Sequence, residues 1–341
     1  MAKQGLKTAP NACEYNLTMG LSEELVMTRL TEEVPYELAG MRLDQALAEL
    51  FADYSRSKLQ TWIKAGRVQI NDQTSLSPKV KLDGGEFITL DAEAEVVIVA
   101  EPENIPLDII FEDESLLIVN KPAGLVVHPA IGNWHGTLLN ALLNHAPSLE
   151  SLPRAGIVHR IDKETSGLLM IAKTLQAHNS LTQQLQDREI TREYIAISRG
   201  RMTAGGTVDE PIGRDPSDRK RYMVRMSGKE AVTHYRVSQR FTHHTLIRVK
   251  LETGRTHQIR VHMAHIRYPL LGDQVYGGRF QMPPKITEHL ANLLRGFKRQ
   301  ALHAAKLGLI HPMTGDYLEW EQPLPEDMTE LLAALDDNDK Q

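Results

Sequence analysis

Apolar residues recur at the spacing of one helix face in residues 42–51 (RLDQALAELF), which predicts a short amphipathic helix. A second helix is predicted through Trp62, and it ends at Gly66 because glycine readily takes the left-handed conformation that closes a helix. Strand-forming residues then follow at 68–71 and 87–90, with an Asp-Gly-Gly turn between them. These elements predict a small domain over residues 40–100.

The pattern after residue 105 predicts a larger domain, over residues 105–325, that is richer in strands than in helices. A wholly apolar run at 168–172 predicts a buried strand, and alternation at 190–198 predicts a strand with Tyr194 and Ala196 on the same face. Further strands are predicted at 109–111, 116–119, 232–237, 245–251, 302–310 and 317–320, and helices at 137–145, 174–188, about 256–266 and 288–297. Because strands and helices do not alternate regularly, the fold class is α+β rather than a doubly wound sheet.

The two ends of the chain lack this regularity. Residues 1–36 show no sustained hydrophobic period, so we expect a flexible N-terminal extension. Residues 326–341 form an acidic tail.

Composition excludes several classes of protein. The 341 residues are 41% hydrophobic and 24% charged, which is ordinary for a soluble protein, and no apolar run reaches the length of a membrane span. Cys13 is the single cysteine, so no disulfide framework or thiolate metal site is expected. No phosphate-binding glycine loop links a strand to a helix, which argues against a nucleotide cofactor. We therefore expect a cytoplasmic protein without a membrane partner and without a cofactor.

Charge is strongly segregated along the chain. The net charge is −5, yet residues 188–267 hold 17 Lys and Arg against 8 Asp and Glu, while residues 316–341 hold nine acids and one Lys. A basic middle segment of this kind can attract a polyanion even in an acidic protein, because the local field acts on the ligand. Charge alone allows an ordinary solvated face equally well.

The most concentrated chemistry lies in the five residues from His159 to Lys163 (HRIDK), where Asp162 is flanked by cations. The loop stands between two apolar segments, so it is either a solvated charged loop or a reactive carboxylate held in place. Further along the chain, three histidines lie close together in the sequence, namely His257, His262 and His265. They do not predict a metal site, since no carboxylate or cysteine joins them at ligand spacing.

Four motifs resemble those of the RluA-type pseudouridine synthases in order and spacing. They are IVNKPAGLVVHP (118–129), HRIDKETSGLL (159–169), REYIA (192–196) and LETGRTHQIRVHM (251–263). Ile161 and Glu164 depart from the usual residues of the second motif but keep their chemical type. The small domain, with its phrase GRVQIND, resembles the S4 RNA-binding domain. Its second helix and the following loop carry four cations and no acid, namely Arg56, Lys58, Lys64 and Arg67.

The resemblance implies a catalytic domain with a central mixed, mainly antiparallel sheet behind the S4-like domain. It also implies roles for three catalytic residues: Asp162 as the essential carboxylate, Arg260 as its paired cation, and Tyr194 as a ring that stacks on uracil and helps position or deprotonate C5. Ile259 is then expected to pack against the same ring, and Arg160 to take the place of the flipped nucleotide and bind the RNA backbone. Lys121, His128, His159 and His257 are expected to organise the pocket.

The implied reaction is the isomerisation of uridines in 23S ribosomal RNA, free or in a precursor of the large ribosomal subunit. The helix 69 stem-loop is the expected target. No metal and no protein partner are expected, and the chain is expected to be a monomer. A synthase for another ribosomal RNA site, or a catalytically silent RNA-binding assembly factor, remains possible at this stage.

Two other enzyme classes fit the residues less well. A glycoside hydrolase or nucleosidase needs a second positioned carboxylate, for which Glu164 is the only nearby candidate. A kinase reading of His159-Arg160 fails because Asp162 does not follow Arg160 directly and no glycine-rich loop is present.

Overall fold

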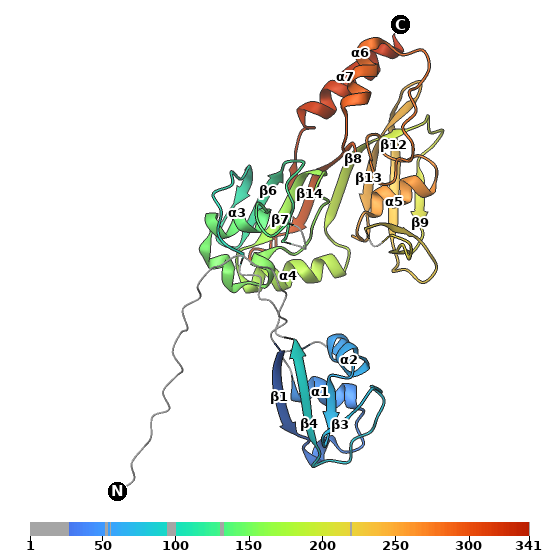
Figure 1. Cartoon of the computed structure of the whole chain (residues 1–341). Coiled ribbons are helices and arrows are strands. Elements are labelled where there is room, and N and C mark those ends of the chain that lie inside the picture. The colour runs from blue at the N-terminus through green and yellow to red at the C-terminus, as the bar shows by residue number, and fades with distance from the viewer. Residues whose placement is uncertain are drawn as a thin grey trace, which may run out of the picture. The chain divides into compact units, whose positions relative to one another are not determined.

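The computed structural model describes residues 27–51, 54, 56–93, 100–129, 133–218 and 220–340. The chain divides into two compact units between Val97 and Ile98. Figure 1 shows the smaller unit in blue to teal and the larger one from green to red.

The smaller unit is a four-stranded antiparallel sheet with order β1-β4-β2-β3, and it carries two helices. Its elements are β1 (Met27–Glu33), α1 (Leu43–Leu50), α2 (Arg56–Lys64), β2 (Val68–Ile70), β3 (Gln73–Thr74) and β4 (Phe87–Glu93), with a 3-10 turn at Tyr36–Leu38. Leu43 and Leu47 of α1 pack with Leu59 and Ile63 of α2 over the sheet, as the helical spacing of these leucines predicts.

The predicted N-terminal extension is wrong for its last part. Met27–Glu33 is strand β1, and all seven of its residues pair with β4. The hydrophobic pattern missed this edge strand because the backbone ladder stabilises it, while Leu30 packs against the core as a partly buried side chain. The rest of the predicted extension, residues 1–26, lies outside the described residues.

The larger unit is built on one mixed sheet with strand order β5-β6-β7-β14-β8-β13-β12-β9, and β15 pairs with β14. Of the pairings in this sheet, β7 with β14 is parallel and the others are antiparallel, so the predicted α+β class and sheet type are confirmed. The strands are β5 (Ile109–Glu112), β6 (Leu116–Lys121), β7 (Ser166–Ala172), β8 (Thr191–Arg199), β9 (Gly206–Asp209), β12 (Val232–Arg240), β13 (His244–Leu251), β14 (Leu302–Ile310) and β15 (Tyr317–Glu321). A separate hairpin joins β10 (Ile212–Arg214) to β11 (Tyr222–Val224).

Threonine side chains cap the first two α-helices of the larger unit. Thr137 and Thr174 cap α3 (Leu138–His145) and α4 (Leu175–Gln186), each by accepting a backbone N–H with its hydroxyl. The main core packs α3 and α5 (Gln258–His265) against one face of the sheet, and it includes Tyr194 and Ile259. Figure 1 shows α5 alongside β12 and β13.

The acidic C-terminal segment is helical. Residues Glu326–Asp339 form α7, which buries Met328 and Leu331 against Leu290 and Leu294 of α6 (Glu288–Gly296). The helix therefore has an apolar stripe beneath its acidic surface. None of the helices in the described ranges is long and apolar enough to span a bilayer.

Candidate active site

The loop that carries Asp162 is held by hydrogen bonds from both sides. The backbone N–H of Gly124 and the ammonium of Lys121 both donate to the carbonyl of Lys163, each at 2.9 Å. On the other side, the amide of Gln300 donates to the hydroxyl of Thr165 at 3.1 Å. The loop is therefore fixed by residues that are distant in sequence, which favours a preorganised carboxylate over a solvated loop.

Gly167 permits the close packing that follows this loop. It has a φ of +113°, and a Cβ there would lie 2.2 Å from the carbonyl oxygen of Ala304 on β14. Only glycine can occupy this position next to the parallel pairing of β7 with β14. Gly167, the second residue of β7, thus lets this strand lie close to β14 just after Asp162.

Lys121 lies beneath the loop rather than in contact with the open site. Its side chain is fully buried, and Nζ donates to the carbonyls of Pro122, Leu125 and Lys163 at 2.6, 2.9 and 2.9 Å. Burial lowers the pKa of Lys121 to about 7, although the nearby Glu164 and Asp162 favour the charged form. Lys121 organises the pocket by joining two loops.

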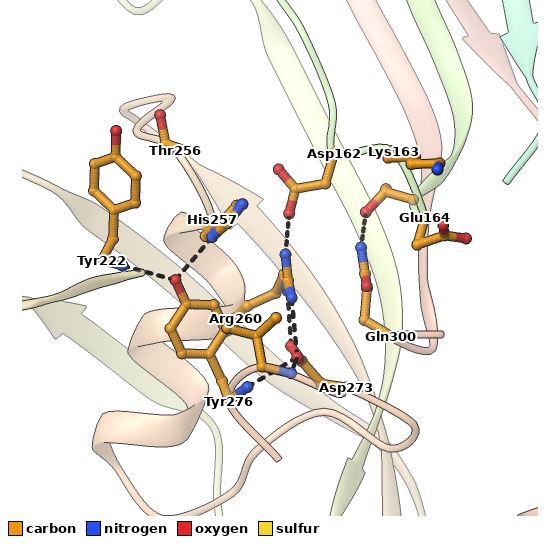
Figure 2. Close-up of polar contacts among 12 residues, drawn as sticks. Asp162, Lys163, Glu164, Tyr222, Thr256, His257, Arg260, Asp273, Tyr276 and Gln300 are labelled. Atoms are coloured by element: carbon orange, nitrogen blue, oxygen red, sulfur yellow. Dashed lines mark hydrogen bonds and ion pairs between the residues drawn. The ribbon is translucent and has the colours of Figure 1, made fainter. Parts of the chain in front are cut away.

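Arg260 on α5 brings two carboxylates together. Its Nη1 donates to Oδ2 of Asp162 at 2.9 Å, while Nε and Nη2 donate to Oδ2 and Oδ1 of Asp273 at 2.7 and 2.9 Å (Figure 2). Burial alone would lower the pKa of Arg260, but these two carboxylates raise it above the usual range. The guanidinium is therefore permanently charged, and the expected contact with Asp162 is present.

Burial separates the roles of the two carboxylates. The side chain of Asp273 is fully buried, whereas that of Asp162 is 22% exposed. Hydrogen bonds and charge from Arg260, with N–H groups of Val275 and Tyr276, lower the pKa of Asp273 although its burial acts in the opposite direction. Asp162 is thus the carboxylate open to a ligand, and Asp273 fixes the cation behind it.

Sequence reasoning missed Asp273. The signal that could have indicated it is the run Gly272-Asp273 followed by Tyr276-Gly277, since the Asp caps a tight turn with its own carboxylate. Tyr276 also contributes to the site, because the centre of its ring lies 5.0 Å from the guanidinium carbon of Arg260.

A groove of about 840 Å³ opens over Asp162. Six arginines line it against two carboxylates, Asp162 and Glu252; the arginines are Arg154, Arg160, Arg188, Arg192, Arg255 and Arg260. Tyr194 and Ile259 also line the groove, and both are at least 90% buried. A basic groove with a carboxylate and a ring at its floor can hold an anionic ligand that presents a planar group.

Tyr194 lies on β8, two residues from Arg192. Burial raises the pKa of Tyr194 above its usual value, and the charge of Arg192 offsets only part of this effect. Tyr194 is therefore a neutral phenol at pH 7, which offers a ring face and a hydrogen-bond donor. Arg192 is buried as well, and within the described residues its Nε has no hydrogen-bond partner, while Nη2 donates to the carbonyl of Glu252. The unused N–H is a free donor beside Tyr194.

The remaining predicted residues of the pocket are divided between exposed and structural positions. Arg160 is exposed at the rim, and its Nη2 donates to the hydroxyl of Thr256 at 3.1 Å. His159 accepts the backbone N–H of Met170 through Nε2 at 3.0 Å, and burial lowers its pKa to about 3. His159 is therefore a neutral structural residue. His128 lines the groove and contacts the carbonyl of Pro129 through Nδ1 at 3.0 Å.

His257 belongs to a hydrogen-bond chain that fixes its tautomer. The hydroxyl of Tyr276 accepts the backbone N–H of Tyr222 at 2.9 Å and lies 2.7 Å from Nδ1 of His257. If the Tyr276 hydroxyl donates a hydrogen bond to Nδ1 of His257, every group in this chain has a partner. The imidazole then carries its own proton on Nε2. Burial lowers the pKa of His257, so the neutral form prevails. Figure 2 shows the other ring nitrogen on the side away from Tyr276.

Lys163 and Glu164 do not take part in the groove. Neither lines it, and Figure 2 shows both on the far side of Asp162, near Gln300. Glu164 is therefore not placed as the second acid of a glycoside hydrolase, and the fully buried Asp273 cannot take that role.

The four cations predicted to bind RNA in the smaller unit are not equivalent. Arg56 donates to the fully buried carboxylate of Asp44 at 2.7 and 3.0 Å, so its guanidinium helps to hold α1 and α2 together. The ammonium of Lys58 lies 4.9 Å from the ring centre of Trp62, and Lys64 is exposed. Arg67 follows α2.

Sequence comparisons agree with these two units. Residues 115–265 match the family model described as RNA pseudouridylate synthase, and residues 41–88 match the S4 domain model. Ribosomal large subunit pseudouridine synthase D of Pasteurella multocida (strain Pm70) is 55% identical to this chain, over 90% of this chain and 94% of the relative. The enzyme of the same name from Escherichia coli (strain K12) is 54% identical, again over 90% and 94% of the two chains. The chain belongs to the RNA pseudouridylate synthase family.

Solved structures show the same fold for the family. Human RNA pseudouridylate synthase domain containing 4 superimposes with a TM-score of 0.53 at 26% identity, over 67% of this chain and 92% of that one. Human RNA pseudouridylate synthase domain containing 1, at 24% identity, gives a TM-score of 0.50 over 69% and 96% of the two chains. The family predicted from the four motifs, the S4 domain and the enzyme class are therefore confirmed.

Proposed function

We propose that this pseudouridine synthase isomerises uridines in the RNA of the large ribosomal subunit, with Asp162 as the reacting carboxylate. The observation that carries the proposal is the geometry of Asp162, which is partly exposed at the floor of a basic groove and held at 2.9 Å by a buried guanidinium. The names of the relatives support large-subunit ribosomal RNA as the substrate.

The reaction breaks the bond from C1′ to N1 of uridine and forms a bond from C1′ to C5. N1 gains a proton and C5 loses one, so no oxidant, reductant or phosphate donor is required. Asp162 is paired with Arg260 and can act on C1′, on the pyrimidine ring, or as the base of a glycal route. Each of these routes needs the same placement of one carboxylate beside the sugar and the base.

Tyr194, Ile259 and Arg260 form the surroundings of the reacting group. Because Tyr194 is a neutral phenol, its ring suits stacking on the uracil and its hydroxyl suits hydrogen-bond donation, whereas it is a weak base for the C5 proton. Ile259 adds an apolar surface next to Arg260 on α5, which keeps water from the ion pair.

Arg160 supports access to a uridine that is stacked within RNA. Such a base must leave the stack before Asp162 can reach it, at a cost of a few kcal/mol. Arg160 is exposed at the groove rim, where its Nη2 donates to the hydroxyl of Thr256, so its guanidinium can occupy the vacated place and bind the RNA backbone. The S4 domain adds a second RNA-binding surface through Lys58, Lys64 and Arg67, with Arg56 mainly holding Asp44.

The expected target is the helix 69 stem-loop, from the likeness to the synthases named D. The enzyme is expected to act as a cytoplasmic monomer without a cofactor. Asp162→Ala is expected to abolish pseudouridine formation and to leave RNA binding nearly unchanged. Carbodiimide primer-extension mapping of ribosomal RNA, from a strain that lacks the gene and carries either version, measures this.

The matched control is Lys163→Ala, which removes the adjacent charge outside the groove and is expected to restore modification fully. If the Asp162→Ala version restored pseudouridines to the ribosomal RNA, Asp162 would be excluded from the mechanism. A pattern identical in the deleted and complemented strains would favour the silent assembly factor, and restored sites elsewhere would replace helix 69 as the target.

A further inference from the structure

The catalytic groove does not account for all of the basic middle segment of the chain. Four cations of β12 and β13 line a separate hollow of about 860 Å³, and Glu193 is the one carboxylate in its lining; the cations are Arg236, Arg240, Arg248 and Lys250. None of the four lines the groove over Asp162. We call Arg236, Arg248 and Lys250 the outer basic face; Arg240 stands apart, because it pairs with Thr245, which lies on the same side of β13 as Ile247 of the main core.

Strand register places this face on the side of the sheet opposite the catalytic core. Tyr194 pairs with Val249, and both belong to the core that includes Ile259. Arg248 and Lys250 alternate with Val249 along β13, so they point to the other side of the sheet. Arg236 pairs directly with Arg248 and therefore shares that side.

No hydrogen bond or ion pair neutralises the outer basic face within the described residues, although Glu193 of β8 lies opposite Lys250. The side chains of Arg236, Arg248 and Lys250 are exposed there and make no hydrogen bond or ion pair with any described residue. Arg240 donates to the carbonyls of Met202 and Thr203, which fixes its position without removing its charge. Two arginines directly opposite each other on neighbouring strands repel one another, so their pairing slightly destabilises the protein when no anion is bound.

The chemistry of the hollow matches a polyanion better than a protein surface. Protein interfaces are depleted of charged residues at their centre, whereas four cations line this hollow. Guanidinium groups bind phosphate oxygens in two-pronged geometry. Leu246 and Ile197, which continue the same side of the strands, pack into the core formed with α6 and α7, so the hollow ends there.

We propose that the outer basic face binds the phosphate backbone of ribosomal RNA outside the segment that enters the catalytic groove. The proposal rests on the proposed function and adds a second contact to it. A long ribosomal RNA would then contact both sides of the sheet, while an isolated stem-loop would occupy the groove alone. Contact with the outer basic face relieves the repulsion between Arg236 and Arg248.

The test compares two RNAs and two variants. The triple variant Arg236→Ala/Arg248→Ala/Lys250→Ala is measured beside the control Arg295→Ala/Lys298→Ala, which removes exposed cations at the end of α6. The RNAs are an excised helix 69 stem-loop and a large-subunit transcript of several hundred nucleotides that contains it. Dissociation constants are measured over a range of salt concentrations, together with kcat/KM for each RNA.

For the long RNA, the triple variant is expected to reduce the slope of log Kd against log salt by about two, as three lost phosphate contacts imply. Its kcat/KM on the stem-loop should stay within twofold of wild type, and the control should match wild type on both RNAs. The long transcript, unlike the stem-loop, should also protect Lys250 from acetylation.

An unchanged salt slope on the long RNA, or an equal loss on both RNAs, would overturn the proposal. So would a change in the sedimenting mass of the RNA-free protein, since that result would assign the face to a contact between copies of the chain. If wild type modified neither RNA, the proposed function would fail, while the salt slopes would still decide whether the outer basic face binds RNA.

Discussion

Asp273 binds Arg260 through both carboxylate oxygens, at 2.7 and 2.9 Å, on the edge of the guanidinium that faces away from Asp162. Two N–H groups of the following turn bind the same carboxylate. The guanidinium therefore has one orientation, and an N–H of its Nη1 is directed at Asp162. The position of the reacting carboxylate depends on a residue that does not itself line the open groove.

Asp273→Asn is expected to weaken both the fold and the reaction. Removing one charge leaves Arg260 buried with a single carboxylate, which costs about 3 kcal/mol of unfolding free energy. Because Arg260 then loses its fixed orientation, kcat should fall by at least tenfold with little change in KM. Chemical denaturation and single-turnover kinetics measure the two effects. The exposed Asp316→Asn is the control, and an Asp273→Asn enzyme with normal kcat would remove Asp273 from the positioning of Arg260.

His257 offers a pair of substitutions that separates its two nitrogens. His257→Asn keeps an acceptor for the hydroxyl of Tyr276 but loses the donor at Nε2, whereas His257→Gln keeps a donor near Nε2 and loses the acceptor. We expect Nε2 to donate to the RNA, so His257→Asn should lower kcat/KM by about tenfold, the worth of one hydrogen bond. His257→Gln should lower it less. The opposite order would show that His257 acts only through Tyr276.

Arg160 is expected to matter most when the target uridine is stacked. Arg160→Ala should lower kcat/KM on a folded stem-loop by about 10- to 100-fold. The reason is that Arg160, by filling the place of the flipped base, offsets part of an unstacking cost of a few kcal/mol. On an unstructured oligonucleotide the loss should be much smaller. Measuring both substrates with Arg160→Ala and with Thr256→Val, which removes only the hydroxyl that Arg160 contacts, provides the comparison. Equal losses on both substrates would assign Arg160 to simple phosphate binding.

His159 should make the stability of the enzyme depend on pH in the acid range. Burial lowers its pKa to about 3 in the folded chain, against an ordinary value of 6.5. Between these values the unfolded chain binds a proton that the folded chain does not, so stability is complete above pH 6.5 and falls as the pH drops toward 3. The expected decline is about 1 kcal/mol per pH unit.

His159→Asn, which cannot be protonated in this range, is the comparison for that prediction. Its free energy of unfolding should decline less steeply than that of wild type between pH 6.5 and pH 4, as followed by denaturant titration at each pH. Parallel curves for the two proteins would show that other groups, such as the buried His244, account for the acid sensitivity.

The sequence by itself determined the fold class, most of the elements, the family and the candidate carboxylate. These features depend on local pattern: helical spacing in α1 and α4, alternation in β8, and the HRIDK motif around Asp162. The pattern failed at β1, because an edge strand with one apolar contact is stabilised by its pairing with β4 rather than by its own hydrophobic period.

Only the tertiary structure decided which charged residues act together. Asp273 and Arg260 lie 13 residues apart, Arg260 and Asp162 lie 98 apart, and Lys121 reaches the carbonyl of Lys163 across 42 residues. Strand register, which a sequence does not display, also put Arg236 beside Arg248 on the side of the sheet away from Tyr194. The physical reason is that burial and side-chain partners arise only when distant segments pack, whereas residue type and spacing are present in the unfolded chain.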